Sequence, residues 1–270
     1  MHLLTTNQAK ILKASDNGTG YRTAILHLRP AYSHKGTKTC DGLHGVCAKT
    51  CIAMTGRGRF DVAVNARDRR TKLLIYTPDI FMSLLDADLM SFTASCANSG
   101  DVPTVRLNGT SDLDWTRYTI PRTGKNVFES HPEILFYDYS KGAQRVLENA
   151  VSNYHVTFSH SERATDSELS AILKSKKNVA VVFAVKKSQE LPTRHKIGGR
   201  WYRVVDGDRD DLRLPERDGR GVIVGLRYKV AFDSKTGKAL PADPRFVVTP
   251  GEGDRATQKI VLPADLNAYN

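Results

Sequence analysis

Short runs of β-branched and aromatic residues recur along the chain, and polar clusters end them. Such runs are typical of strands, whose side chains pack on a pleated and partly buried surface. The longest apolar run, residues 179–185, is much shorter than the roughly 20 residues of a membrane-spanning helix, so it predicts a buried strand. In all, the pattern predicts strands at residues 24–28, 104–107, 133–137, 154–158, 179–185, 202–205 and 221–226.

Stretches with helical character separate most of these strands. Residues 58–75 favour a helix, and a second helix is expected to start at Pro78 with Thr77 as its cap, because proline is tolerated in the first helical turn. Residues 145–151 and 166–174 favour short helical connections. Alternating strands and helices predict a parallel sheet covered on both faces.

Polar clusters directly follow several predicted strands, at residues 108–112, 138–141 and 159–162. In a β/α barrel the carboxyl ends of all strands meet on one face, where binding groups are placed. The sequence therefore favours an α/β fold with a partial (β/α) barrel of the TIM-barrel type over an open doubly wound sheet. The expected organisation is an N-terminal extension (1–20), a barrel-like domain (21–229) and an irregular C-terminal tail or cap (230–270).

Composition places the chain among ordinary globular proteins. Of its 270 residues, 40% are hydrophobic and 26% are charged, and four cysteines are too few for a disulfide scaffold. No amino-terminal apolar run precedes a small-residue cleavage site, so a cytoplasmic protein with no membrane partner is expected.

The chain is basic, with a net charge of +11, which favours acidic partners such as nucleic acid, nucleotides or other phosphorylated metabolites. Basic residues cluster within residues 57–72 and again within 174–187. Each cluster is either a solvated face or a nucleic-acid footprint, since no nucleic-acid-binding motif of recognised spacing accompanies it.

Three of the four cysteines lie close together in the sequence, as Cys40, Cys47 and Cys51 with the spacing C-x6-C-x3-C. Three thiolates can hold three irons of a [4Fe–4S] cluster and leave the fourth iron open to a ligand. With His44 added, the same segment offers the four ligands of a closed zinc site. Glycine, lysine and threonine surround these cysteines, which argues against buried core thiols. Cys96 lies in a predicted helix and is expected to be a packed thiol.

Two glycine-containing turns are candidates for binding a cofactor. Gly56 and Arg57 precede a predicted helix, whose first turn can present backbone N–H groups to an anion. The second turn follows a strand and either recognises a ribose or an amine, or merely caps the next helix through Ser111 or Asp112. The cofactor-binding candidates are therefore Gly56, Arg57, Asn108, Gly109, Thr110, Ser111 and, after another strand, Ser159.

Three strand exits supply the four catalytic candidates. Asp138 and Lys141 form a possible acid–base pair, Asp206 is placed to bind a polar substrate, and Asp112 closes the second glycine-containing turn. His155 and His160 each offer a proton-transfer group, although a histidine in a strand is more often structural.

The order of these motifs resembles a phage and prophage family of uncharacterised proteins, gene product eighty-eight. The motifs that carry the resemblance lie between residues 25 and 229, and include VRLNGTSD at 105–112, FYDYSK at 136–141 and VDGD at 205–208. The resemblance implies a phage protein in the host cytoplasm, and it implies no particular activity.

A strand followed by a three-cysteine loop, a glycine and a helix is also remotely similar to the start of radical S-adenosylmethionine enzymes. Those enzymes use the spacing C-x3-C-x2-C, from which this chain departs. The similarity implies a partial barrel, a 4Fe-4S cluster and S-adenosylmethionine as cofactors, and chemistry on a nucleotide or nucleic acid. The alternative is a non-catalytic, zinc-stabilised phage accessory protein that binds DNA or a host factor.

Overall fold

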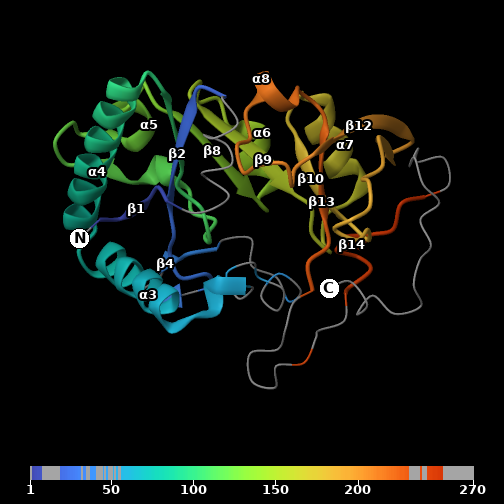
Figure 1. The fold of residues 1–270 in the computed structure, drawn as a ribbon, viewed down its shortest axis with the longest axis horizontal. Helices are drawn as coiled ribbons and strands as arrows, with labels where there is room; N and C mark the ends of the chain where they lie inside the picture. Colours follow the sequence, from blue (N-terminus) through green and yellow to red (C-terminus); the bar gives the residue numbers. More distant parts are fainter. Residues whose placement is uncertain are drawn as a thin grey trace.

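The computed structural model describes residues 2–7, 19–31, 33–34, 37–40, 45, 47, 51, 53, 56–230, 238 and 242–251. Within these residues the protein has a mixed α/β fold built on one ten-stranded, mostly parallel sheet (Figure 1). All seven strands expected from the sequence are present, and they form the parallel part of the sheet. In spatial order they are β2 (Tyr21–Leu26), β5 (Val102–Arg106), β8 (Leu135–Ser140), β9 (Tyr154–Ser159), β10 (Val179–Phe183), β13 (Ile223–Arg227) and β12 (Arg200–Asp206).

Antiparallel strands form both edges of this sheet. β1 (Leu4–Thr5) pairs with β2, and β11 (Arg194–Ile197) pairs with β12. The sheet is therefore open in the described part of the chain, and no closed barrel forms. From β2 to β10 the parallel strands follow one another in chain order, whereas β13 lies between β10 and β12.

A short strand outside the expected barrel-like domain also joins the sheet. β14 (Val247–Val248) pairs with β10 in parallel, in a stretch for which the sequence predicts an irregular tail. Val247 is buried against Ala184 and Tyr228. Burial of this apolar side chain holds the β14 segment on the sheet. The residues beyond 251 lie outside the described part.

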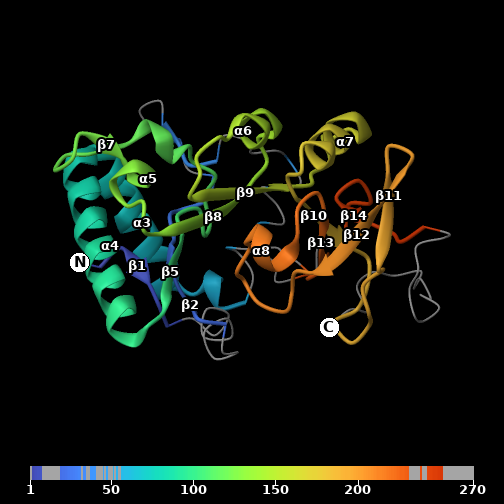
Figure 2. The same cartoon turned by 90° about the horizontal axis from the view of Figure 1, so that it is seen from above.

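Helices connect the parallel strands. η2 (Gly56–Arg59), α3 (Asp61–Tyr76) and α4 (Pro78–Ser99) follow β2, while α6 (Ala143–Glu148) and α7 (Asp166–Lys174) match the two short helical connections that the sequence predicts. Figure 2 shows α4, α6 and α7 along one side of the curved sheet, with α8 (Pro215–Asp218) on the other. The remaining described elements are short: β3 (Ser33–His34), β4 (Thr37–Lys38), η3 (Trp115–Arg117), β6 (Thr119–Ile120), β7 (Lys125–Asn126) and α5 (Val127–Ser130).

α4 begins at Pro78 with Thr77 at its N-cap position, as expected, but the Thr77 side chain makes no capping hydrogen bond. The Thr77 hydroxyl instead donates to the carbonyl of Leu73 in the preceding helix. By length and composition alone α4 could cross a membrane, yet one of its faces packs into the core through Phe81, Leu85 and Leu89. A helix that supplies core side chains passes the same test, so α4 gives only weak evidence of a membrane contact.

The two faces of the parallel sheet differ in polarity. Along β8, Phe136 packs into the main core with the helices, whereas the next residue, Tyr137, packs with Leu212 and Leu214 on the opposite side. Successive strand residues point to opposite faces, so Tyr139 shares the second face with Tyr137. Thr104 and Arg106 of β5 share that face too, because Val105 between them packs in the main core. At the carboxyl ends of β5 and β8, the second face therefore carries the polar side chains of Arg106 and Tyr139.

Candidate functional site

A cavity of about 270 Å³ lies at the carboxyl ends of the parallel strands. Cys40, Cys47 and Cys51 line it together with residues that follow or end β5, β8, β9, β12 and β13. The structure thus brings the cysteine segment and the polar strand exits to one place, as the sequence predicts. Of the candidate residues, those that line the cavity are Cys40, Cys47, Cys51, Asn108, Gly109, Thr110, Ser111, Asp112, Lys141 and Ser159.

The start of the cysteine segment is tied to the turn that follows β5. The N–H of Asp112 donates to the carbonyl of Thr39 at 2.7 Å, and Cys40 forms an isolated parallel bridge with Asp112. The Thr39 hydroxyl donates to the carbonyl of Arg29 at 2.7 Å, which also fixes the segment to the residues after β2. Cys40 is therefore positioned by backbone contacts from two directions.

The three thiols are partly buried, and burial raises the pKa of each. The pKa of Cys40 rises to about 11, and the nearby thiols Cys47 and Cys51 contribute to that rise. Burial also raises the pKa of Cys47 and of Cys51, although Lys141 opposes it in both. Neutral buried thiols are poor nucleophiles, so this arrangement does not favour cysteine-based covalent catalysis.

A metal site is not already assembled in the described residues. No group of three or more His, Cys, Asp and Glu side chains there lies close enough to hold a metal ion. His44, the fourth ligand of the zinc alternative, lies outside the described residues. Holding a metal therefore requires the three thiols to approach one another and to lose their protons.

Asp112 is engaged in structural contacts. Its carboxylate pairs with the guanidinium of Arg145 and accepts a hydrogen bond from the N–H of Lys141 at 2.9 Å. Because its backbone also holds Thr39, this residue joins the cysteine segment to the loop after β8. A positioning role explains these contacts without an acid–base role.

Asn108 organises the turn that it begins. Its side-chain oxygen accepts hydrogen bonds from Ser111 Oγ and from the indole of Trp115, and its amide donates to the carbonyl of Leu113. Thr110 also bonds within the protein, to the carbonyl of Leu28 at 2.5 Å. The side chains predicted to bind a cofactor therefore shape the turn, which leaves Lys141 and Arg106 as the more available ligand contacts.

Gly109 follows β5 and lies very close to the end of β2, where a residue with a side chain would not fit. A Cβ atom at this position would lie 2.5 Å from Ile25 Cγ2 and 2.6 Å from His27 Nδ1. Burial, with Arg106 nearby, lowers the pKa of His27 to about 4, so the imidazole that meets the glycine is neutral at pH 7.

Gly109→Ala is expected to lower the free energy of unfolding by about 1–3 kcal/mol, the usual cost of forcing atoms into a packed site. Urea denaturation measures it. Gly124→Ala is a poor control because its φ of 67° is itself strained for alanine, so Gly142→Ala is used, where an added Cβ meets its nearest neighbour at 3.5 Å. Equal losses in both variants would contradict the packing explanation.

Asp138 points away from the cavity. Strand alternation puts it on the core side with Phe136, where its carboxylate accepts from the N–H of Asn108 at 2.7 Å and from the hydroxyl of Tyr154 at 3.2 Å. Burial raises the pKa of Asp138 to about 7, against the effects of Arg106 and these hydrogen bonds. It therefore cannot form the acid–base pair with Lys141 inside the cavity in this arrangement.

The raised pKa predicts a pH-dependent stability. Unfolded Asp138 ionises near pH 4, so the stability that the folded protonated form provides is complete below that pH and is lost as pH rises through about 7. Asp138→Asn cannot ionise, so its unfolding free energy should rise relative to wild type by up to about 1.4 kcal/mol per pH unit between roughly pH 4 and 7. Urea unfolding at several pH values measures this; parallel curves for the two proteins would contradict it.

Lys141 lines the cavity. Its ammonium donates to Ser159 Oγ at 3.2 Å and to the carbonyl of His160 at 3.1 Å, and it sits 5.2 Å from the ring centre of Phe246. Lys141 and Ser159 were predicted from the sequence, whereas Phe246 belongs to the expected tail. The side chain is thus held between β8, β9 and the segment that carries β14.

Arg106 is a cavity residue that the sequence did not indicate. It forms an ion pair with Asp211 at 2.9 Å and lies 5.0 Å from the ring centre of Tyr139, and all three line the cavity. Its Nε atom is buried and has no hydrogen-bond partner among the described residues. As the last residue of β5, Arg106 could have been noticed as a charged residue ending a buried strand.

The remaining candidates lie at the margin of the cavity or away from it. Asp206 is exposed and pairs with Arg227 at 3.0 Å, while its neighbour Gly207 lines the cavity. Gly56 and Arg57 begin η2. His155 lies at the other end of β9, and burial lowers its pKa and that of His160.

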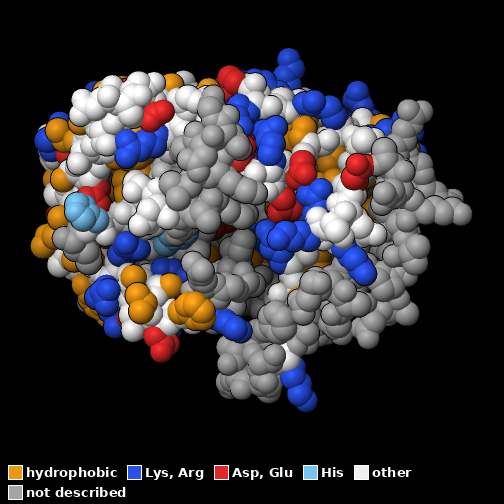
Figure 3. Space-filling view, in the orientation of Figure 1, with side chains coloured by type: hydrophobic (Ala, Val, Ile, Leu, Met, Phe, Trp, Pro, Cys, Tyr) orange, Lys and Arg blue, Asp and Glu red, His pale blue; other side chains and the backbone are white. Residues whose placement is uncertain are grey.

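On the face shown in Figure 3, more basic side chains lie over one half than over the other. Figure 3 shows Lys and Arg interleaved with a few acidic side chains over the half that carries α8, β12 and β13. At the cavity, Arg227 and Lys229 are paired with Asp208. The positive charge around the cavity is therefore partly neutralised by its own acidic neighbours.

Comparison with known proteins gives one match. The family model described as Gene product 88 matches residues 2–241, a span that contains the cysteine segment and every strand from β1 to β13. No curated protein and no solved structure matches the chain. The similarity to radical S-adenosylmethionine enzymes therefore stays a hypothesis.

Proposed function

The chain belongs to the gene product 88 family, and from that premise we propose that its three-cysteine cavity is the active site of a radical-type iron–sulfur enzyme acting on a nucleotide or nucleic acid. The observation that carries the proposal is that Cys40, Cys47 and Cys51 line one cavity with the carboxyl ends of the parallel strands. Binding and catalytic groups of β/α proteins are placed at that end of the sheet.

The donor set suits an iron–sulfur cluster. Three soft thiol ligands face one cavity, and iron–sulfur clusters are held by cysteine thiolates. When bound, a [4Fe–4S] cluster would supply an electron for reductive cleavage of S-adenosylmethionine at its open iron. Cys40, Cys47 and Cys51 would hold it, and Asp112 would keep Cys40 in place through the Thr39–Asp112 contact.

The cavity also has groups that suit a phosphorylated or nucleoside ligand. Lys141 and Arg106 offer positive charge, while Tyr139 and Phe246 offer aromatic rings on which a base can stack. These groups are partly buried at the end of the sheet, which would limit the access of water to a reactive intermediate. The parallel strands from β2 to β10 lie in chain order, which supports a partial-barrel arrangement of that part of the sheet.

Incubation of the reduced, anaerobically reconstituted chain with S-adenosylmethionine tests the reaction class. We expect methionine and 5′-deoxyadenosine to form, and no turnover by a Cys51→Ala variant prepared in the same way. Intact S-adenosylmethionine in the presence of a fully loaded, reduced cluster would contradict the radical-type reaction. It would leave cluster binding itself unaffected.

A further inference from the structure

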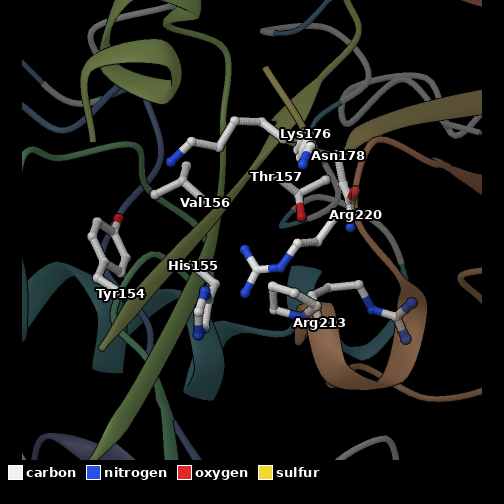
Figure 4. A pocket seen from close by; sticks show the side chains of 10 residues that line it. Tyr154, His155, Val156, Thr157, Lys176, Asn178, Arg213 and Arg220 are labelled. Atoms are coloured by element: carbon white, nitrogen blue, oxygen red, sulfur yellow. The ribbon is translucent and has the colours of Figure 1, made fainter. Parts of the chain in front are cut away.

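A second hollow lies at the amino-terminal ends of the parallel strands, where β9, β10 and β13 begin. It has a volume of about 40 Å³, and its lining includes His155, Lys176, Lys177 and Arg220 (Figure 4). About 10–15 Å³ of such volume holds one water molecule, so the hollow has room for the oxygens of one phosphoryl group. None of the described residues that line it is acidic.

The local fold holds Arg220 over this hollow. Gly219 and Gly221 on either side have φ angles of 96° and 65°, which a residue with a side chain rarely adopts. The Asn178 side chain fixes the turn, because its amide donates to the carbonyl of Gly219 at 2.8 Å and its oxygen accepts from the N–H of Val222 at 3.1 Å. Figure 4 shows the Arg220 guanidinium reaching toward His155.

The basic groups in the hollow are poorly neutralised. Arg220 pairs with Glu216 at 3.6 Å, and both side chains are more than half exposed. Lys177 donates to the carbonyl of Asn149 at 2.7 Å, a neutral acceptor, and forms no ion pair with a described residue. Arg213 also lines the hollow, but it pairs with Asp210 and Asp218.

The basic groups of the hollow lower one another's pKa, as clustered positive charges do. Burial lowers the pKa of His155, and Arg220 and Lys177 lower it further, whereas Glu216 raises it. Burial and Arg220 also lower the pKa of Lys177. A bound anion would relieve this mutual repulsion.

We propose that this hollow is a phosphate-binding site, in which Arg220, Lys176 and Lys177 bind the oxygens of a phosphate group. The group comes either from the backbone of a nucleic acid or from a free phosphate-containing ligand. The site is separate from the cysteine cavity, since the two lie at opposite ends of the same parallel strands. The site includes Lys176 and Lys177, which belong to the basic cluster within residues 174–187.

Titration of the full chain with inorganic phosphate, followed through the imidazole NMR signals of His155, tests the site. We expect saturable binding with a rise in the pKa of His155, and about tenfold weaker binding by Arg220→Ala, the loss of one charge-assisted contact. Arg163→Ala is the control, because Arg163 is exposed in the loop after β9, at the other end of the strand. Glu216→Gln removes the acid that competes for Arg220 and should tighten binding.

A short single-stranded DNA oligonucleotide separates the two sources of phosphate. If Arg220→Ala weakens binding of the oligonucleotide as well as of phosphate, the site serves a nucleic-acid backbone. If only phosphate binding weakens, it serves a free ligand. Unchanged phosphate binding in Arg220→Ala and Glu216→Gln, with the variants folded as wild type by circular dichroism, would overturn the proposal.

Discussion

Replacing Cys40, Cys47 or Cys51 singly by alanine is expected to reduce the iron bound per chain by at least about tenfold after anaerobic reconstitution. All three thiols line one cavity, and they are the only cysteines of the described residues that do so. With one thiolate removed, two protein ligands remain, which is too few to retain a cluster in competition with water. Iron and acid-labile sulfide are measured on the same samples.

Cys96→Ala is the matched control for these variants. Cys96 is fully buried in α4 and does not line the cavity, so its removal should leave iron and sulfide unchanged. His44→Ala makes a second comparison, because a three-thiolate cluster survives that change whereas a zinc site of four ligands loses its metal. Full iron retention by Cys47→Ala, or equal iron loss in Cys96→Ala, would contradict ligation by the three cysteines.

Asp112→Ala is expected to destabilise the fold by about 3–5 kcal/mol, the usual effect of removing one partner of a buried ion pair. The carboxylate is 12% exposed and the Arg145 side chain 20%, so the guanidinium would remain largely buried without its partner. The N–H of Lys141 would lose its acceptor as well. Urea denaturation measures the loss.

The neighbouring Asp114→Ala is the control for this variant. Asp114 caps the short helix η3 and pairs with the exposed Arg117, contacts worth about 1 kcal/mol or less on average. Asp112→Ala should also weaken cluster loading, because loss of the side-chain contacts with Arg145 and the N–H of Lys141 loosens the turn whose backbone holds Cys40. If both variants lost the same stability, the Asp112–Arg145 pair would not be the link between the two loops.

Much of this fold could be predicted from the sequence because its strands are buried on both faces. The runs at 154–158 and 179–185 identify β9 and β10 to within two residues at each end, since apolar, β-branched residues there have no other favourable place. The short elements were missed. β14 has only Val247–Val248, which pairs with β10 through contacts distant in sequence.

The sequence predicts where the candidate site lies better than it predicts what each of its residues does. Polar residues at strand exits do converge with the cysteines, as parallel strands require. Which side chains face the cavity depends on which face of the strand each residue occupies. On β8 this alternation places Asp138 in the core and Tyr139 at the cavity. Asn108 and Asp112 carry the residue types of a binding loop, yet their polar atoms are used by Trp115 and Arg145.

The metal content of the full chain, purified without oxygen, tests the central claim most directly. Iron, sulfide and zinc are measured per chain, together with the absorption and electron paramagnetic resonance spectra. Cluster binding predicts brown protein with about four irons and four sulfides per chain, as one [4Fe–4S] cluster requires, and negligible zinc. Colourless protein with one tightly held zinc per chain, lost on His44→Ala, would contradict it.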